Sequence, residues 1–117
     1  MALIVQKYGG TSVGTPERIR KVAERVAKSY REGNGLVVVV SAMSGETNRL
    51  TSLAGEVSDR PSLREMDVLL STGEQVTIAL LCMALHSIGL EAISYTGGQV
   101  HILTDDVHSK ARIKNID

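Results

Sequence analysis

The chain has 117 residues, of which 43% are hydrophobic and 22% charged, so it is long enough for one compact domain and too apolar for a disordered chain. Equal numbers of basic and acidic residues give a net charge of zero, which argues against the cationic surface that nucleic acids and anionic membranes attract. The single cysteine, Cys82, forms no internal disulfide and builds no zinc or iron–sulfur site alone. The apolar run Met1–Val5 is too short for a secretory signal, and no apolar stretch reaches the roughly 20 residues that a bilayer requires. We therefore expect a cytoplasmic protein that binds neither nucleic acid nor membrane.

The first part of the chain reads as a strand, a glycine-rich loop and a helix. The apolar run Leu3–Val5 predicts a strand, which leads directly into the loop Lys7–Ser12. Thr15 can cap the helix that follows, Pro16 suits its first turn, and Gly33 closes it with a left-handed residue. The apolar residues of this helix, spaced three and four apart, are Ile19, Val22, Ala23, Val26, Ala27 and Tyr30.

A central strand and a weaker helix are predicted next. Leu36–Val40 has no polar alternation, so we expect both of its faces to be covered, as in a parallel sheet. It ends in the loop Ser41–Gly45. The helical segment after this loop carries the apolar residues Leu50, Leu53, Ala54 and Val57.

Two helices are predicted beyond residue 61. Ser62 and Glu65 have the spacing of a capping box, which opens a helix that runs to Leu70. The tripeptide Ser71–Gly73 is expected to interrupt it. The next helix, Glu74–Ile88, is apolar almost all round, which predicts packing in the interior or against a partner subunit.

Three further segments are predicted to be extended: Ala92–Tyr95, Val100–Leu103 and Ala111–Ile116. Strands that alternate with helices through short loops predict an α/β fold. We expect a three-layer α/β/α arrangement around a mainly parallel sheet with right-handed crossovers. Three or four strands make a thin sheet for covering on both faces, so we expect the fold to be incomplete and the chain truncated.

Three loops follow predicted strands, and open α/β sheets bind their ligands at these carboxyl ends. They are Lys7–Ser12, Ser41–Asn48 and Thr96–Gln99, all rich in glycine or small polar residues. The paired glycines of the first loop let backbone N–H groups approach anionic oxygens, and its lysine adds a positive charge, a combination that suits phosphate. A turn with a solvated lysine fits this short pattern equally well, because neither a Walker A sequence nor GxGxxG is present.

Three sequence blocks together resemble the aspartate kinases of the amino acid kinase superfamily. They are Gln6–Val13 (QKYGGTSV), Val39–Met43 (VVSAM) and Leu70–Glu74 (LSTGE). The spacing between the blocks also fits, as do Thr96–Gln99 and Leu103–Ile113, so the similarity covers essentially the whole chain. The resemblance implies ATP-dependent phosphorylation of the L-aspartate side-chain carboxylate to 4-phospho-L-aspartate, the first step towards lysine, threonine, methionine and diaminopimelate.

The same resemblance implies a role for each matching residue. Lys7 would be the catalytic residue, because its charge would neutralise the transferring phosphoryl group. The residues implied to bind ATP are Lys7, Tyr8, Gly9, Gly10, Ser12 and Ser41. Those implied to bind aspartate are Ser41, Thr47 and Glu74, with Glu74 pairing with the α-ammonium. Mg²⁺ would arrive with ATP and be held mainly by the nucleotide, so no metal site is expected on the chain.

Phosphorylation of a carboxylate makes modest demands on the protein. A carboxyl group with an ordinary pKa of about 3.9 is already ionised at neutral pH, so no general base is needed. Catalysis then depends on alignment and on neutralising charge at the phosphoryl oxygens. In this family the kinase domain is longer than residues 1–117, which resemble its amino-terminal part without the nucleotide-binding half or the ACT domains. We therefore expect little activity from the chain alone, and either homo-oligomerisation or association with the rest of the kinase.

Other interpretations of these residues stay open. Glu74 also fits a first-turn helix residue favoured by the helix dipole, and Thr47 fits an ordinary N-cap. Asp105, Asp106 and His108 could suggest a metal site, but polar loop residues of this kind are more often solvated. A core role is expected for Cys82, a structural role for His86, and either a core position or a subunit contact for Met83. As functions, a kinase acting on acetylglutamate or glutamate and a non-catalytic association module are the alternatives.

Overall fold

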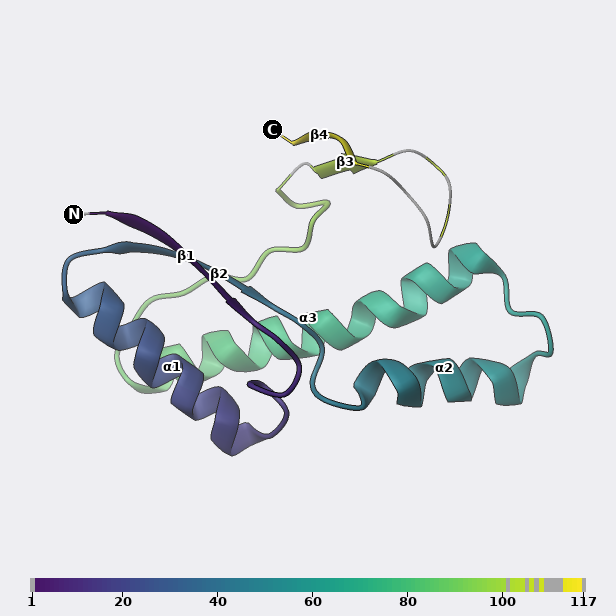
Figure 1. Ribbon diagram of the computed structural model, residues 1–117, viewed down its shortest axis with the longest axis horizontal. Helices are drawn as coiled ribbons and strands as arrows, with labels where there is room; N and C mark the ends of the chain where they lie inside the picture. The colour runs from purple at the N-terminus through teal and green to yellow at the C-terminus, as the bar shows by residue number, and fades with distance from the viewer. Residues whose placement is uncertain (1, 101, 105, 107, 109–112, 117) are drawn as a thin grey trace.

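The computed structural model describes residues 2–100, 102–104, 106, 108 and 113–116. Its elements are β1 (Leu3–Tyr8), α1 (Pro16–Arg31), β2 (Gly35–Val40), α2 (Glu46–Val57), α3 (Leu63–Ser87), β3 (Ile102–Thr104) and β4 (Ile113–Ile116). In Figure 1 the strands β1 and β2 cross one side of α1 and α3, while α2 folds back beside one end of α3. The predicted α/β class is confirmed.

β1 and β2 form a parallel pair with α1 as the crossover. Leu3 lies opposite Gly35 and Tyr8 lies opposite Val40 in this register. The Ser41 amide donates a hydrogen bond to the Tyr8 carbonyl (3.2 Å), so the pairing continues past the end of β2. Both strands therefore deliver their following loops to the same edge of the sheet.

Helices α1 and α3 cover one face of this two-stranded sheet. Alternate side chains of a strand point to opposite faces. The buried core on the helical side consists of Val13, Ile19, Val22, Ala23, Val26, Val40, Leu81 and Leu85. The apolar side chains of the other face, exposed by 48 to 73%, are Leu3, Val5, Val37 and Val39. The sheet is incomplete, as expected, but the predicted covering of Leu36–Val40 on both faces is not found in the part of the chain that the structure describes.

The local signals of α1 are confirmed at both ends. The Thr15 side chain accepts a hydrogen bond from the Arg18 amide (3.2 Å), and Pro16 occupies the first turn. Gly33 follows the helix with a φ of +97°, a conformation that glycine adopts without strain. Five of the six predicted apolar residues are buried, whereas Tyr30 is 54% exposed.

α3 is one continuous helix of 25 residues, so the predicted interruption before Glu74 is wrong. The Ser71 hydroxyl donates to the Val68 carbonyl (2.8 Å) and the Thr72 hydroxyl to the Leu69 carbonyl (2.6 Å). Both hydroxyls are thus satisfied within the helix, where they do not divert the backbone into a turn. The glycine that follows is buried against a neighbouring loop, which offsets its low helix propensity.

α3 buries only one side, so the prediction of an apolar interior helix holds in part. Its buried residues are Gly73, Thr77, Leu81 and Leu85. Large apolar side chains exposed on it include Val68, Val76 and Met83. By length and mean hydropathy (1.7) this helix is apolar enough to cross a membrane. Its packing against α1, α2 and β2 identifies it instead as the central helix of this fold.

The segment after α3 differs from the prediction. Ala92–Tyr95 has no regular secondary structure, so the strand predicted there is wrong for this structure. Leu90 and Ala92 pack against the core, but among the described residues β1 pairs only with β2. A strand is stabilised by hydrogen bonds to a neighbouring strand, and this segment has no such neighbour within the described part of the chain.

The last two strands form an antiparallel hairpin. Ile102 lies opposite Ile116, with an irregularity in the register between Leu103 and Thr104. These strands lie where extended structure was predicted, at residues 100–103 and 111–116, of which 101, 111 and 112 fall outside the described residues. The pair is separate from the β1–β2 sheet and so adds no parallel strand to it.

Candidate active site

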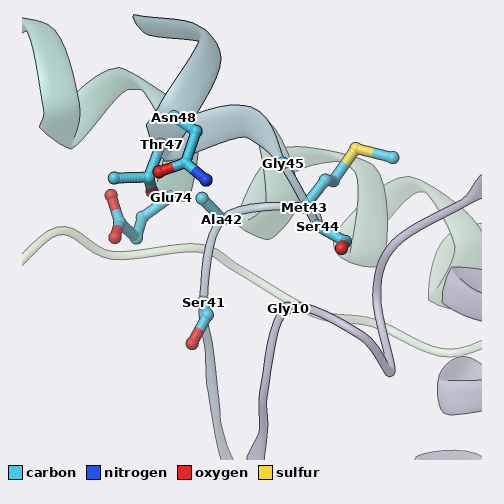
Figure 2. Close-up of a pocket in the computed structure, with 9 residues that line it drawn as sticks. All are labelled: Gly10, Ser41, Ala42, Met43, Ser44, Gly45, Thr47, Asn48 and Glu74. Carbon is cyan, nitrogen blue, oxygen red and sulfur yellow. The ribbon is translucent and has the colours of Figure 1, made fainter. Parts of the chain in front are cut away.

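The loops that follow β1 and β2 meet the start of α2 and the middle of α3 in a cleft of about 330 Å³. Figure 2 shows its lining residues, which are Gly10, Ser41, Ala42, Met43, Ser44, Gly45, Thr47, Asn48 and Glu74. Four of the predicted site residues are brought together here from four parts of the chain: Gly10, Ser41, Thr47 and Glu74. Four others do not line it: Lys7, Tyr8, Gly9 and Ser12.

A tight turn after β2 sets the start of α2. The Glu46 amide donates to the Met43 carbonyl (3.0 Å), and Gly45 has a φ of +81° at the N-cap position. Thr47 therefore lies inside the first turn, and its interpretation as an N-cap is wrong. Thr47 and Glu74 both line the cleft, as Figure 2 shows.

Glu74 lies in the middle of α3, far from either helix end. The alternative that it is a first-turn residue favoured by the helix dipole is therefore wrong, because that effect is confined to the terminal turns. Its side chain is exposed and points towards the cleft (Figure 2), and no described residue forms an ion pair with it. An unpaired carboxylate in such a position is suited to a cationic group of a ligand.

The neighbouring acid, Glu46, is already neutralised. Its carboxylate pairs with the Arg49 guanidinium at 2.6 Å, and this hydrogen bond holds the pKa of Glu46 below its usual value. Of these two acids only Glu74 lines the cleft, and no described residue forms an ion pair with it. Glu46 therefore has a structural role, whereas Glu74 is available to a ligand.

The glycine loop after β1 is held by a backbone hydrogen bond within the loop and by a side-chain hydrogen bond from α1. The Ser12 amide donates to the Gly9 carbonyl (3.0 Å), and the Arg18 guanidinium donates to the Thr11 carbonyl (2.8 Å). Gly10 packs so tightly that a β carbon on it would lie 2.9 Å from the Ala42 carbonyl oxygen. Only glycine allows the first loop to approach the second this closely.

Lys7 lies near the carboxyl end of β1, opposite Val39, and its side chain is exposed. The alternation along β1 puts it on the sheet face that the described helices leave open. Tyr8 is on the helical face, and its hydroxyl donates to the Gln6 side chain (2.9 Å). The phosphate-binding roles implied for Lys7, Tyr8, Gly9 and Ser12 stay predictions.

The sequence analysis assigned no site role to five of the lining residues: Ala42, Met43, Ser44, Gly45 and Asn48. The signals for them are their place in the loop Ser41–Asn48, which is predicted to bind a ligand, and, for Ala42 and Met43, their place in the block Val39–Met43. Asn48 adds a side-chain amide next to Thr47 (Figure 2). Gly10 and Gly73 both pack against Ala42.

The two histidines among the remaining polar candidates have structural partners. His108 pairs through Nδ1 with an Asp67 carboxylate oxygen at 3.1 Å, while Asp105 falls outside the described residues. No group of three potential metal ligands gathers within the described ranges. His86 contacts the Ala92 carbonyl through Nε2 (2.8 Å), which confirms a structural role.

The two sulfur residues of α3 differ in burial. Cys82 is partly buried, and this burial raises the pKa of its thiol, which disfavours the nucleophilic thiolate. Met83 is 62% exposed, so it is not part of the core of the described residues, and its alternative role in a subunit contact stays a prediction.

Comparisons with known proteins agree with this architecture. The model of the amino acid kinase family matches residues 2–117. An aspartate kinase of Stutzerimonas stutzeri is 67% identical over 117 residues, an aspartokinase of Pseudomonas aeruginosa 66%, and aspartokinase 2 of Bacillus subtilis 56%. Each match covers the whole chain, which spans only 28 to 29% of the length of these relatives.

Solved structures show the same fold. The aspartate kinase from Synechocystis has a TM-score of 0.80 and 61% identity, covering 84% of this chain and 17% of that one. E. coli aspartokinase III, in complex with aspartate and ADP, has a TM-score of 0.79 over 97% of this chain and 35% of that one. At 21% identity, the second likeness concerns the fold alone. The 117-residue chain belongs to the amino acid kinase family.

Proposed function

We propose that this chain is the amino-terminal, amino acid-binding part of the catalytic domain of an aspartate kinase. Such an enzyme transfers the terminal phosphoryl group of ATP to the side-chain carboxylate of L-aspartate. The observation that carries the proposal is the meeting of Gly10, Ser41, Thr47 and Glu74 at one cleft, in a chain up to 67% identical to aspartate kinases. On this proposal, the rest of the nucleotide site and the ACT domains lie beyond these residues.

The charge of the cleft suits the amino end of aspartate. Glu74 is assigned to the α-ammonium group, because its carboxylate faces the cleft with no ion-pair partner among the described residues. Thr47 and Ser41 add hydroxyl groups on the same cleft, where they can hydrogen-bond the substrate. The substrate carboxylate that reacts is ionised at neutral pH, so it needs no base to attack phosphorus.

The phosphoryl donor is assigned to the glycine loop. Gly9 and Gly10 offer backbone N–H groups, and Ser12 and Tyr8 flank them in the sequence. Lys7 precedes this loop at the end of β1, where its ammonium would neutralise charge that develops on the transferring phosphoryl group. ATP would bring Mg²⁺ bound to its phosphates, and we assign no carboxylate of this chain to the metal.

Apolar surfaces left open in the chain support association as a further part of the proposal. They comprise one face of the β1–β2 sheet and the side of α3 that carries Val68, Val76 and Met83. Exposed apolar area of this kind is typically covered by other protein surface. We propose that the remainder of the kinase or a second subunit covers it, and that the enzyme acts in the cytoplasm.

The proposal is tested with the complete kinase that contains this chain. Purified enzyme is incubated with MgATP and L-aspartate, ADP release is followed, and the acyl phosphate is trapped with hydroxylamine as the hydroxamate. We expect turnover with L-aspartate and little with L-glutamate or N-acetyl-L-glutamate. Preference for either of these two would identify another amino acid kinase, and absence of turnover with all three would contradict a kinase function.

A further inference from the structure

Ala42 lies between the two glycines that hold the two halves of the site. A β carbon on Gly10 would lie 2.9 Å from the Ala42 carbonyl oxygen, and a β carbon on Gly73 would lie 2.9 Å from the Ala42 Cβ. Ala42 itself is only 6% exposed. Both contacts are too short for any residue larger than glycine at position 10 or 73 unless the backbone moves.

The contact at Gly73 also involves α2. The next nearest atoms to a β carbon on Gly73 are the Glu46 Cγ at 3.6 Å and the Leu50 Cδ1 at 3.7 Å. In α2 these two residues lie one position before and three positions after Thr47. Gly73 immediately precedes Glu74 within the rigid middle of α3. The packing of Gly73 against Ala42 therefore determines the distance between Glu74 and the first turn of α2.

We propose that Ala42 is a positioning residue with two separate contacts. Its backbone carbonyl sets the place of the glycine loop, and its methyl group sets the place of Glu74 relative to Thr47. This inference rests on the proposed function, because it assigns the first contact to the phosphoryl donor and the second to the amino acid. The binding of ATP and the binding of aspartate would then depend on different atoms of Ala42, the carbonyl oxygen and the methyl group.

The two contacts are separable by mutation. Gly73→Ala is expected to raise the KM for aspartate about tenfold or more, because a shift near 1 Å disturbs a charged contact, with the KM for ATP essentially unchanged. Ala42→Gly removes the opposing methyl group, so the double variant Ala42→Gly/Gly73→Ala is expected to regain most of the wild-type KM. The neighbours left at 3.6 and 3.7 Å are ordinary van der Waals contacts.

Gly10→Ala provides the contrasting case. It is expected to lower kcat. Ala42→Gly is expected to give no rescue, because glycine at position 42 still has the backbone carbonyl oxygen that the new β carbon at position 10 would contact. Gly55→Ala is the matched control, since position 55 is also helical but has no atom within 4 Å of an added β carbon. Its kinetic constants are expected to equal those of the wild type.

The experiment measures aspartate and ATP kinetics of the complete kinase for these variants, with thermal unfolding recorded in parallel. If Gly73→Ala alone fails to fold, the double variant must fold and bind aspartate. An unchanged KM in Gly73→Ala, or equal rescue of both glycine variants by Ala42→Gly, overturns the inference while leaving the proposed function intact. A parent enzyme inactive with aspartate overturns the proposed function, and this inference with it.

Discussion

Gly73 packs against Ala42 so closely that a methyl group on the glycine would lie 2.9 Å from the Ala42 Cβ. This contact joins the middle of α3 to the loop after β2. It gives a physical reason for a glycine in a helix interior, where alanine is ordinarily favoured by about 1 kcal/mol. It also places the next residue, Glu74, at the cleft.

The sign of a glycine-to-alanine change is expected to differ between two helices. Gly73→Ala should destabilise the fold by about 1–3 kcal/mol through overpacking. Gly55→Ala should stabilise it by about 0.5–1 kcal/mol, because position 55 is open and alanine has the higher helix propensity. Urea unfolding followed by circular dichroism compares the two variants with the parent. Stabilisation by both substitutions would show that α3 is free to move away from Ala42.

Removal of the Lys7 charge is expected to act on catalysis. Lys7→Ala should lower kcat by about 10²-fold or more, because a cation near the transferring phosphoryl group stabilises the transition state more than the ground state. The KM for aspartate should change little. Steady-state kinetics of the complete kinase check this, with Lys21→Ala, an exposed lysine of α1, as the control.

A purely structural lysine would behave differently. Lys7→Ala would then lower the yield of folded enzyme and leave kcat per active site unchanged. Titration of active sites separates these two results, and an unchanged kcat would contradict the catalytic role proposed for Lys7.

The Glu46–Arg49 pair is expected to respond to acid. Arg49 holds the pKa of Glu46 below its usual value, so the folded-state pKa is lower than the unfolded-state pKa. The contribution of the pair is therefore present above the unfolded-state pKa and is lost as the pH falls through the folded-state pKa. Because the pair is exposed, its effect on total stability should be small.

The titration of Glu46 gives the measurement for this pair. Carboxyl ¹³C NMR should show its midpoint moving upwards in Arg49→Leu, because the hydrogen bond and the positive charge are both removed. The same midpoint in both proteins would contradict the pairing of these two side chains.

Elements with strong local signals could be predicted from the sequence. Thr15, Pro16 and Gly33 mark the ends of α1 through hydrogen bonding and backbone conformation, which depend on few neighbours. The continuity of α3 could not be predicted, because the glycine that should weaken it is offset by a contact with Ala42, 31 positions earlier in the sequence. The missing strand at residues 92–95 has a similar cause, since strands require partners from elsewhere in the chain.

The same division applies to the site. Thr47 and Glu74 were identified by resemblance, and the structure places both at one cleft, while their role in binding aspartate stays a prediction. Asn48 and Ala42 were not identified, because their importance depends on how loops from separate segments pack together. The sequence pattern contains the residue types of the site, whereas the contacts between its parts arise only in the fold.

We assign Glu74 to the α-ammonium group of aspartate. Removal of its negative charge should therefore weaken the recognition of that group and leave the recognition of the substrate carboxylates unchanged. Glu74→Gln is expected to raise the KM for L-aspartate, because the amide cannot neutralise the α-ammonium group. Glu56→Gln, on the exposed surface of α2, serves as the matched control.

The most direct measurement compares kcat/KM for L-aspartate and for succinate, which has the same carbon chain and carboxylates but no ammonium group. The parent kinase and the position 56 control should strongly prefer aspartate. In Glu74→Gln this preference should fall by roughly tenfold or more, as expected for losing a hydrogen bond between charged groups. A preference that is the same in all three proteins would contradict the assignment of this cleft to the amino end of aspartate.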